Sequence, residues 1–302
     1  MKEQIHSGMN REKYLHVAKS YTRELLLPAL GSAGPVELVP AEHGHRSYVY
    51  FIQGPAVEPM VLRLERDPSS LKRRLRGHEI LIRHGFNVPR VLCFHAGKEV
   101  FEKYGFFFFV ESFMPGEHFM PGPDSGRFGR ALGKALARMH AISSPHFGWP
   151  GEWRFPGRLM GGARLIARAR KQLETLRRTD PEKARRIRNW LRRQPVSAWF
   201  PRPRLTTGGF ISSNLLFSQG DVTFIDLARV RYGFAPRDIA QVRLVLTAGD
   251  GQARKTFMKA YKEMAPSELR SEIDRVLPLY EVLFILRLAV KGRDTNLDAV
   301  LV

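Results

Sequence analysis

The chain has 302 residues, of which 43% are hydrophobic and 26% charged, and this is the composition of an ordinary soluble globular protein. The length allows one large domain or two lobes, with a core that needs no covalent staples. The single cysteine, Cys93, excludes an intrachain disulfide and fits a reducing compartment. The formal net charge of +20 either attracts polyanions or reflects arginines on solvated faces.

The sequence contains no recognisable membrane signal. The first residues, MKEQIHSGMNREKY, lack the apolar stretch of a signal peptide. The longest apolar run near the end is LYEVLFILRLAV, which is too short for a bilayer and contains Glu281 and Arg287. We therefore expect a soluble, cytoplasmic protein without a transmembrane segment.

The first third of the chain is predicted to be rich in β-structure. Strands are predicted within residues 36–64, and the run Phe106–Phe109 indicates a strand that is buried on both faces. Between them, residues 69–85 carry apolar side chains at helical spacing, and Ser69 or Ser70 can cap that helix.

The pattern changes at residues 112–116, after which helices predominate. Residues 126–142 have apolar positions at helical spacing, and two helices are predicted within the arginine-rich region 154–195. The second of these should begin at Asp180, with Pro181 at its first position. A shift from strands to helices indicates a hinge between a small lobe and a larger one.

The most informative stretch is residues 205–240, LTTGGFISSNLLFSQGDVTFIDLARVRYGFAPRDIA. It contains, in order, Thr207-Gly208-Gly209, Asn214, Ile225-Asp226-Leu227, Tyr232-Gly233 and Asp238-Ile239-Ala240. In this order and spacing it resembles the HGD-x-x-x-x-N loop, the IDF or IDW strand end, the YG pair and the DLA of the aminoglycoside phosphotransferase and choline kinase family. Upstream matches to the same family are Val61–Leu64, Glu79 with its following residues, Val110-Glu111 and Ala137–His140.

The resemblance implies an α+β fold of the two-lobed, protein-kinase-like type. Residues 1–111 would form a nucleotide-binding lobe, made of a small antiparallel sheet, one helix and a helical N-terminal extension. Residues 112–116 would be the hinge. Residues 117–302 would form a mainly helical lobe that contains the catalytic-loop and metal-binding segment 205–240.

Four residues have the chemistry that an ATP and Mg²⁺ site requires. A carboxylate and an amide oxygen make a hard-oxygen site for Mg²⁺, and Asp226 with Asn214 would supply it. Arg63, oriented by Glu79, would hold the phosphates. The alternatives are a strand-closing turn at Asp226, a loop-stabilising amide at Asn214 and a surface ion pair between Arg63 and Glu79.

Further residues have assigned places in the resemblance. Glu111 falls where the family binds adenine, and His45 and Ser47 lie in the stretch of the phosphate-covering loop, or merely in a solvated hairpin tip. Asp238 is predicted to bond the backbone of the catalytic loop, and His140 to pack or to anchor a loop.

Gly209 stands at the position of the catalytic aspartate, so no catalytic residue is assigned. General-base help contributes about 10² to 10⁴-fold, and phosphoryl transfer depends mainly on positioning and charge neutralisation. The chain is therefore predicted to be an aminoglycoside phosphotransferase-like small-molecule kinase, with weak transfer of the ATP γ-phosphate to a hydroxyl of an anionic acceptor. The alternatives are a nucleotide-binding pseudokinase with an interaction or regulatory role and, below it, a nucleic-acid-binding protein.

The basic region 154–195 argues against a cationic acceptor such as an aminoglycoside, because like charges repel. An anionic partner suits it better: lipid at a membrane surface, a phosphorylated glycan or nucleic acid. The remaining alternative is a pair of solvated, arginine-rich helices without a partner.

Overall fold

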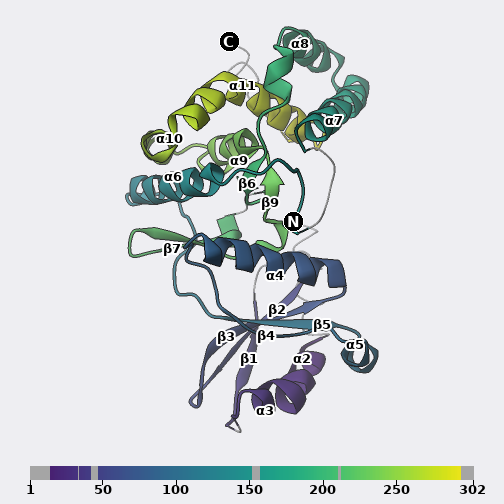
Figure 1. Cartoon of the computed structure of the whole chain (residues 1–302), viewed down its shortest axis with the longest axis vertical. Coiled ribbons are helices and arrows are strands. Elements are labelled where there is room, and N and C mark those ends of the chain that lie inside the picture. The colour runs from purple at the N-terminus through teal and green to yellow at the C-terminus, as the bar shows by residue number, and fades with distance from the viewer. Residues whose placement is uncertain (1–13, 33, 42–46, 152–156, 210–211, 294–302) are drawn as a thin grey trace. The chain divides into compact units, whose positions relative to one another are not determined.

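The computed structural model describes residues 14–32, 34–41, 47–151, 157–209 and 212–293. The chain divides into two compact units, each described by itself below (Figure 1). The first unit consists of Met1–Gly116 together with Thr223–Ala228, and the second of Glu117–Val222 together with Arg229–Val302. The sequence did not predict that the short segment Thr223–Ala228 returns to the first unit.

The first unit is built on an antiparallel sheet of five strands in the order β1-β2-β3-β5-β4. The strands are β1 (Glu37–Pro40), β2 (Tyr48–Gly54), β3 (Val57–Glu65), β4 (Val91–His95) and β5 (Phe107–Ser112). β3 and β5 occupy the middle, and their register pairs Arg63 with Phe109 and Val61 with Glu111. The predicted small antiparallel sheet is thus confirmed.

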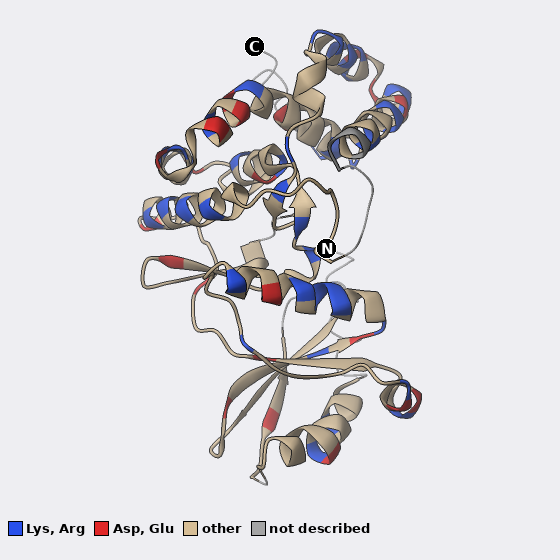
Figure 2. Cartoon of the chain, in the orientation of Figure 1, with Lys and Arg blue, Asp and Glu red and all other residues tan. Residues whose placement is uncertain are grey.

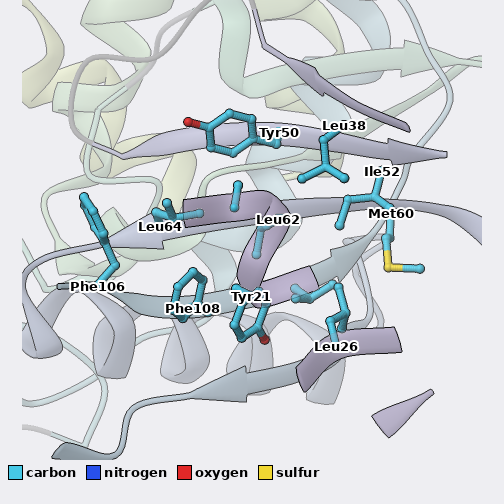
Figure 3. Packing of buried hydrophobic residues seen from close by; sticks show 12 residues of the cluster. Tyr21, Leu26, Leu38, Tyr50, Ile52, Met60, Leu62, Leu64, Phe106 and Phe108 are labelled. Atoms are coloured by element: carbon cyan, nitrogen blue, oxygen red, sulfur yellow. The ribbon is translucent and has the colours of Figure 1, made fainter. Parts of the chain in front are cut away.

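Helices cover both faces of this sheet (Figure 1). On one face, α2 (Leu15–Tyr21) and a π-helical turn (Thr22–Leu26) contribute to a core that includes Tyr21, Leu62 and Phe108 (Figure 3). The short helix α3 (Leu27–Ala29) follows them. On the other face, α4 (Pro68–Arg83) packs Leu71 against Phe107 and Phe109. Successive side chains of a strand point to opposite faces, so the Phe run is buried on both, as predicted.

The start of α4 differs from the prediction. The cap is Asp67 rather than Ser69 or Ser70: its Oδ1 accepts a hydrogen bond from the Ser69 backbone nitrogen at 2.9 Å. Pro68 then occupies the first helical turn, where its missing N–H costs nothing. A short helix, α5 (Lys98–Tyr104), precedes β5 and was not predicted.

The second unit is mainly helical. Its helices are α6 (Ser125–Ala141), α7 (Gly157–Thr179), α8 (Pro181–Arg192), α9 (Ala235–Gln241), α10 (Gly251–Met264) and α11 (Ser267–Ala289). α6 and α10 pack closely because Gly129 and Gly133 of α6 have no side chain: a Cβ there would overlap the carbonyls of Ala253 and Phe257. The Asp180 side chain caps α8 by accepting from the Lys183 backbone nitrogen at 2.9 Å, as predicted.

Two small sheets complete the second unit. β6 (Arg204–Thr206) pairs with β9 (Arg231–Gly233), and β7 (Leu215–Ser218) pairs with β8 (Asp221–Phe224), whose last two residues belong to the first unit. Within the residues that the structure describes, no helix is long and apolar enough to cross a membrane.

Candidate functional site

A cluster of charged side chains is buried in the first unit beneath α4. Arg63 and Glu65 come from β3, Arg74 and His78 from α4, Glu111 from β5, and Asp226 from the segment Thr223–Ala228. All except Asp226 are buried, and the Asp226 side chain is 32% exposed. Charges at such depth are stable only when they are paired.

Arg63 pairs with Glu111 across the middle of the sheet. The Arg63 Nε donates to Glu111 Oε1 at 2.7 Å, and both side chains are almost fully buried. Burial alone would raise the pKa of the Glu111 carboxyl, but the Arg63 charge and the His78 hydrogen bond outweigh it and lower this pKa to about 2. Glu111 is therefore ionised and turned toward the cluster.

Arg74 is the cation that joins the two ends of the cluster. Its Nη2 donates to Glu65 Oε1 at 2.8 Å, and its Nη1 lies 2.8 Å from Asp226 Oδ1. Burial disfavours the charged guanidinium, but the carboxylates of Asp226 and Glu65 overcome this and raise the pKa of Arg74. One α4 side chain thereby holds two acids from different segments.

The segment that carries Asp226 packs directly on α4. Gly77 allows this approach, because a Cβ at Gly77 would lie 2.5 Å from the Leu227 carbonyl oxygen. The Asn87 side-chain nitrogen also donates to Thr223 Oγ1 at 3.1 Å. These contacts hold Thr223–Ala228 in the first unit and present the Asp226 carboxylate to Arg74.

His78 completes the cluster. Its Nδ1 lies 3.0 Å from the Pro89 carbonyl oxygen, which can only accept, so Nδ1 donates. Its Nε2 lies 3.3 Å from Glu111 Oε2. In the imidazolium form both nitrogens donate, and the cluster then has three cations facing three carboxylates. His78 itself is buried on the inward face of α4.

Asp226 has an unusual backbone conformation, and its carboxylate is already paired with Arg74. Its φ of 60° lies in the left-handed region, which is uncommon for residues other than glycine and often marks a functional position. Burial would raise the pKa of Asp226, but the charges of Arg74 and Arg63 hold it below its usual range. A divalent ion at this carboxylate would have to compete with Arg74. The donor set as it stands does not fit such an ion, and a magnesium site at Asp226 and Asn214 stays a prediction.

The predicted pair between Arg63 and Glu79 is not formed. Glu79 lies on the exposed side of α4 and pairs with Arg76 at 2.7 Å. Residues 74 and 78 are one helical turn apart and share the inward face, whereas residue 79 is rotated away from them. A charged residue at an inward-facing position of the predicted helix was the signal available for Arg74, which was not predicted as a site residue.

The structure describes one of the two predicted phosphate-loop residues. His45 lies outside the described residues, and Ser47 immediately precedes β2 and is partly buried. Asn214 ends a short 3-10 turn (Ser212–Asn214) of the second unit and is partly buried. Its role as a ligand stays a prediction.

The loop at Thr207-Gly208-Gly209 follows β6 in the second unit and has a backbone that favours glycine. Gly208 has φ 72° and Gly209 has φ 142°, and both values disfavour side chains. A Cβ at Gly208 would also overlap the Arg229 carbonyl oxygen. The nearest atoms to a Cβ at Gly209 would be Arg229 Nη1 at 3.7 Å and Gln241 Oε1 at 3.8 Å.

Asp238 holds this loop in place, as predicted. Its Oδ2 accepts from the Thr207 backbone nitrogen at 2.9 Å and from Thr207 Oγ1 at 3.0 Å. His140 lies beneath it, fully buried, with Nε2 3.7 Å from the same oxygen and Nδ1 2.9 Å from the Tyr261 hydroxyl. The loop scaffold is therefore intact although Gly209 has no side chain.

The five-stranded antiparallel sheet of the first unit and the helical second unit define a kinase-like fold. The chain belongs to the Phosphotransferase enzyme family, whose sequence profile matches residues 37–272. A search of curated proteins gave no significant match.

Solved structures with the same fold share little sequence with this chain. A macrolide 2'-phosphotransferase from Brachybacterium faecium is 17% identical over 91% of this chain and 95% of its own, with a TM-score of 0.58. A putative aminoglycoside phosphotransferase from Ralstonia eutropha is 16% identical over 91% and 85%, with a TM-score of 0.61. A mutant of aminoglycoside phosphotransferase APH(4)-Ia, in a ternary complex with AMP-PNP and hygromycin B, is 13% identical over 90% and 91%, with a TM-score of 0.59. At these identities the likeness concerns the fold.

Proposed function

We propose that the protein is a nucleotide-binding pseudokinase: it binds a nucleoside triphosphate in its first unit and does not transfer the γ-phosphoryl group at a useful rate. The observation that carries the proposal is the ion pair of 2.8 Å between Arg74 and Asp226. It neutralises the carboxylate at the position where the family motif places its metal ligand.

Nucleotide binding is supported by the family and by the position of Arg63. A structural neighbour was solved with AMP-PNP and another with ADP. Arg63 is on β3 at the motif position for a phosphate contact and is fixed by Glu111 at 2.7 Å. Only the Arg63 Nε is used in that bond, so its guanidinium can also meet phosphate, without a dedicated metal.

Weak chemistry is supported by the second unit. Gly209 has no group that could accept the proton of a substrate hydroxyl, and the residues that fix the loop, Asp238 and His140, are buried and bonded to their neighbours. The loss of a base costs about 10² to 10⁴-fold in rate. Together with the pairing of the Asp226 carboxylate with Arg74, this removes two of the side-chain contributions that the motif would make to transfer.

The second candidate is a slow phosphotransferase that acts on an anionic acceptor. The anchored loop favours it: the Thr207 backbone and hydroxyl are held by Asp238 at 2.9 and 3.0 Å, as an active scaffold requires. Positioning provides most of the catalysis of phosphoryl transfer, so this scaffold could support a low rate with magnesium supplied by the nucleotide complex.

Calorimetry with ATP, with and without Mg²⁺, tests the proposal. We expect binding to wild type with an affinity that Mg²⁺ changes by less than about threefold, since Arg74 already neutralises Asp226. ATP consumption should match that of a heat-inactivated control. An affinity that depends strongly on Mg²⁺, together with measurable turnover, would favour the slow phosphotransferase. Absence of binding at millimolar ATP eliminates both candidates.

A further inference from the structure

Five arginines of the second unit lie on elements that meet near the Gly208-Gly209 loop. They come from separate elements: Arg168 from α7, Arg229 from the short turn Leu227–Arg229, Arg231 from β9, Arg237 from α9 and Arg287 from α11. The fold brings them together because α7 and α9 both pack against α11, and because β9 pairs with β6, the strand that leads into the loop. Except for Arg168, which is exposed, they are partly buried.

The space beside Gly209 faces a guanidinium. Arg229 Nη1 is the atom nearest to a Cβ position at Gly209, at 3.7 Å. In the family motif this position holds the side chain of an aspartate, so a negative charge belongs where this chain has none. Arg231 lies opposite Thr206, the residue that leads into the loop: its carbonyl accepts from Thr206 Oγ1 at 2.9 Å, and its guanidinium lies 5.9 Å from the centre of the Trp149 ring.

Among the described residues, no carboxylate forms an ion pair with any of these arginines. By contrast, Arg204 and Arg243 of the same unit do form ion pairs. The Asp238 carboxylate acts on Arg231 and Arg237, but its Oδ2 already accepts two hydrogen bonds from Thr207.

The mutual repulsion appears in their acid–base behaviour. Burial is the main cause that lowers the pKa of Arg237 to about 10; the charge of Arg231 adds to it, and the Asp238 carboxylate partly opposes it. Burial also lowers the pKa of Arg231, against the opposing charge of Asp238 and with smaller contributions from Arg168 and Arg229. Burial and the charges of Arg168 and Arg229 lower the pKa of Arg287. Partly buried cations that destabilise one another are stabilised by a bound anion.

We propose that Arg229, Arg231, Arg237 and Arg287 form a binding site for a phosphate-bearing small molecule, with one anionic group in the space beside Gly209. Guanidinium groups bind phosphate oxygens through paired hydrogen bonds, and several forks around one space favour a compact di- or trianion. This site belongs to the second unit alone, and it does not depend on nucleotide binding in the first.

The exposed basic surface of α7 and α8 is a different feature (Figure 2). There, arginines make local surface pairs, such as Arg177 with Glu174 at 2.6 Å and Arg185 with Glu182 at 2.8 Å. Exposed pairs of this kind leave their side chains solvated and contribute little. The surface of α7 and α8 provides matched controls: Arg192 and Arg193, at the end of α8, are exposed arginines outside the group of five.

Inorganic pyrophosphate is the probe, titrated by calorimetry at about 150 mM salt so that diffuse attraction is screened. We expect binding to wild type, and an affinity at least about tenfold weaker for Arg231→Gln and Arg237→Gln, whereas Arg192→Gln stays within about twofold. Without pyrophosphate, Arg237→Gln should melt no lower than wild type, since repulsion is relieved; an arginine that only supports the fold would lower the melting temperature. Arg229→Lys keeps the charge but loses the fork, and should also weaken binding.

Three results would overturn the proposal. The first is no melting-temperature increase for wild type at about 10 mM pyrophosphate. The second is equal weakening in Arg237→Gln and Arg192→Gln, which indicates a diffuse field and would direct attention to nucleic acid. The third is loss of pyrophosphate binding in Arg63→Gln but not in Arg237→Gln, which would assign the probe to the first unit. ATP binding that persists in Arg237→Gln separates this site from the proposed nucleotide site.

Discussion

Replacing Arg74 with methionine is the most direct perturbation of the buried charge cluster. The Arg74 side chain is 2% exposed, and it pairs with Glu65, whose side chain is 5% exposed, and with the partly exposed Asp226, both at 2.8 Å. Methionine is a shorter, unbranched and apolar side chain without charge. The substitution removes the cation and leaves Glu65 buried without its partner.

The expected loss in the free energy of unfolding is about 3 kcal/mol. Removing one member of a buried ion pair costs about 3–5 kcal/mol. The lower end applies because Asp226 is 32% exposed and water can solvate it after the change. A loss of this size is a large fraction of a typical stability of about 5–15 kcal/mol.

Urea unfolding followed by circular dichroism measures this change. The matched control is Arg76→Met on the same helix, where the side chain is 57% exposed and pairs with Glu79 one turn on. Its expected cost is below about 0.5 kcal/mol. The double variant Arg74→Met, Glu65→Leu should recover most of the loss, because no buried charge is then orphaned at that end.

The same variants test whether Arg74 takes the place of a metal. Wild type should gain no stability from Mg²⁺, whereas Arg74→Met should gain some because its Asp226 carboxylate is free. Equal small losses for Arg74→Met and Arg76→Met would refute the buried-cluster reasoning. Stabilisation of wild type by Mg²⁺ alone would refute the neutralisation of Asp226 by Arg74.

Three further outcomes are expected. The pKa of Glu111 is about 2 in the folded chain, below its ordinary value of 4.5, so between these pH values the unfolded chain binds the proton more readily. The free energy of unfolding should therefore fall by roughly 3 kcal/mol as the pH drops from 4.5 to about 2. Glu111→Gln should flatten this acid dependence in urea titrations. Gly208→Ala should lower stability by more than about 2 kcal/mol in thermal denaturation, because its Cβ would overlap the Arg229 carbonyl. The control is Gly249→Ala, which has φ 80° but open space around the Cβ position. It should cost only the backbone strain of about 1–2 kcal/mol. Gly209→Asp should not produce ATP turnover, because φ 142° disfavours the new side chain; turnover in that variant would show that only a carboxylate was missing.

Periodicity and motif order in the sequence predicted most of the elements. The continuous run of phenylalanines predicted the buried strand at Phe106–Phe109, and the Asp180-Pro181 pair predicted the start of α8. These features depend on neighbouring residues, so local sequence contains them. The linear order of Thr207-Gly208-Gly209, Asn214 and Asp226 likewise sufficed for the family.

Which charges meet was decided only by the tertiary structure. The sequence predicted a pair between Arg63 and Glu79, but in the fold Arg63 pairs with Glu111, 48 positions away. Asp226 forms an ion pair with Arg74. The arginines around Gly209 come from five elements spread over more than 100 residues. Partners in buried clusters are selected by burial and by the packing of distant segments, such as Thr223–Ala228 on α4. The residue type at one position does not specify which opposite charge the folded chain brings within 3 Å of it.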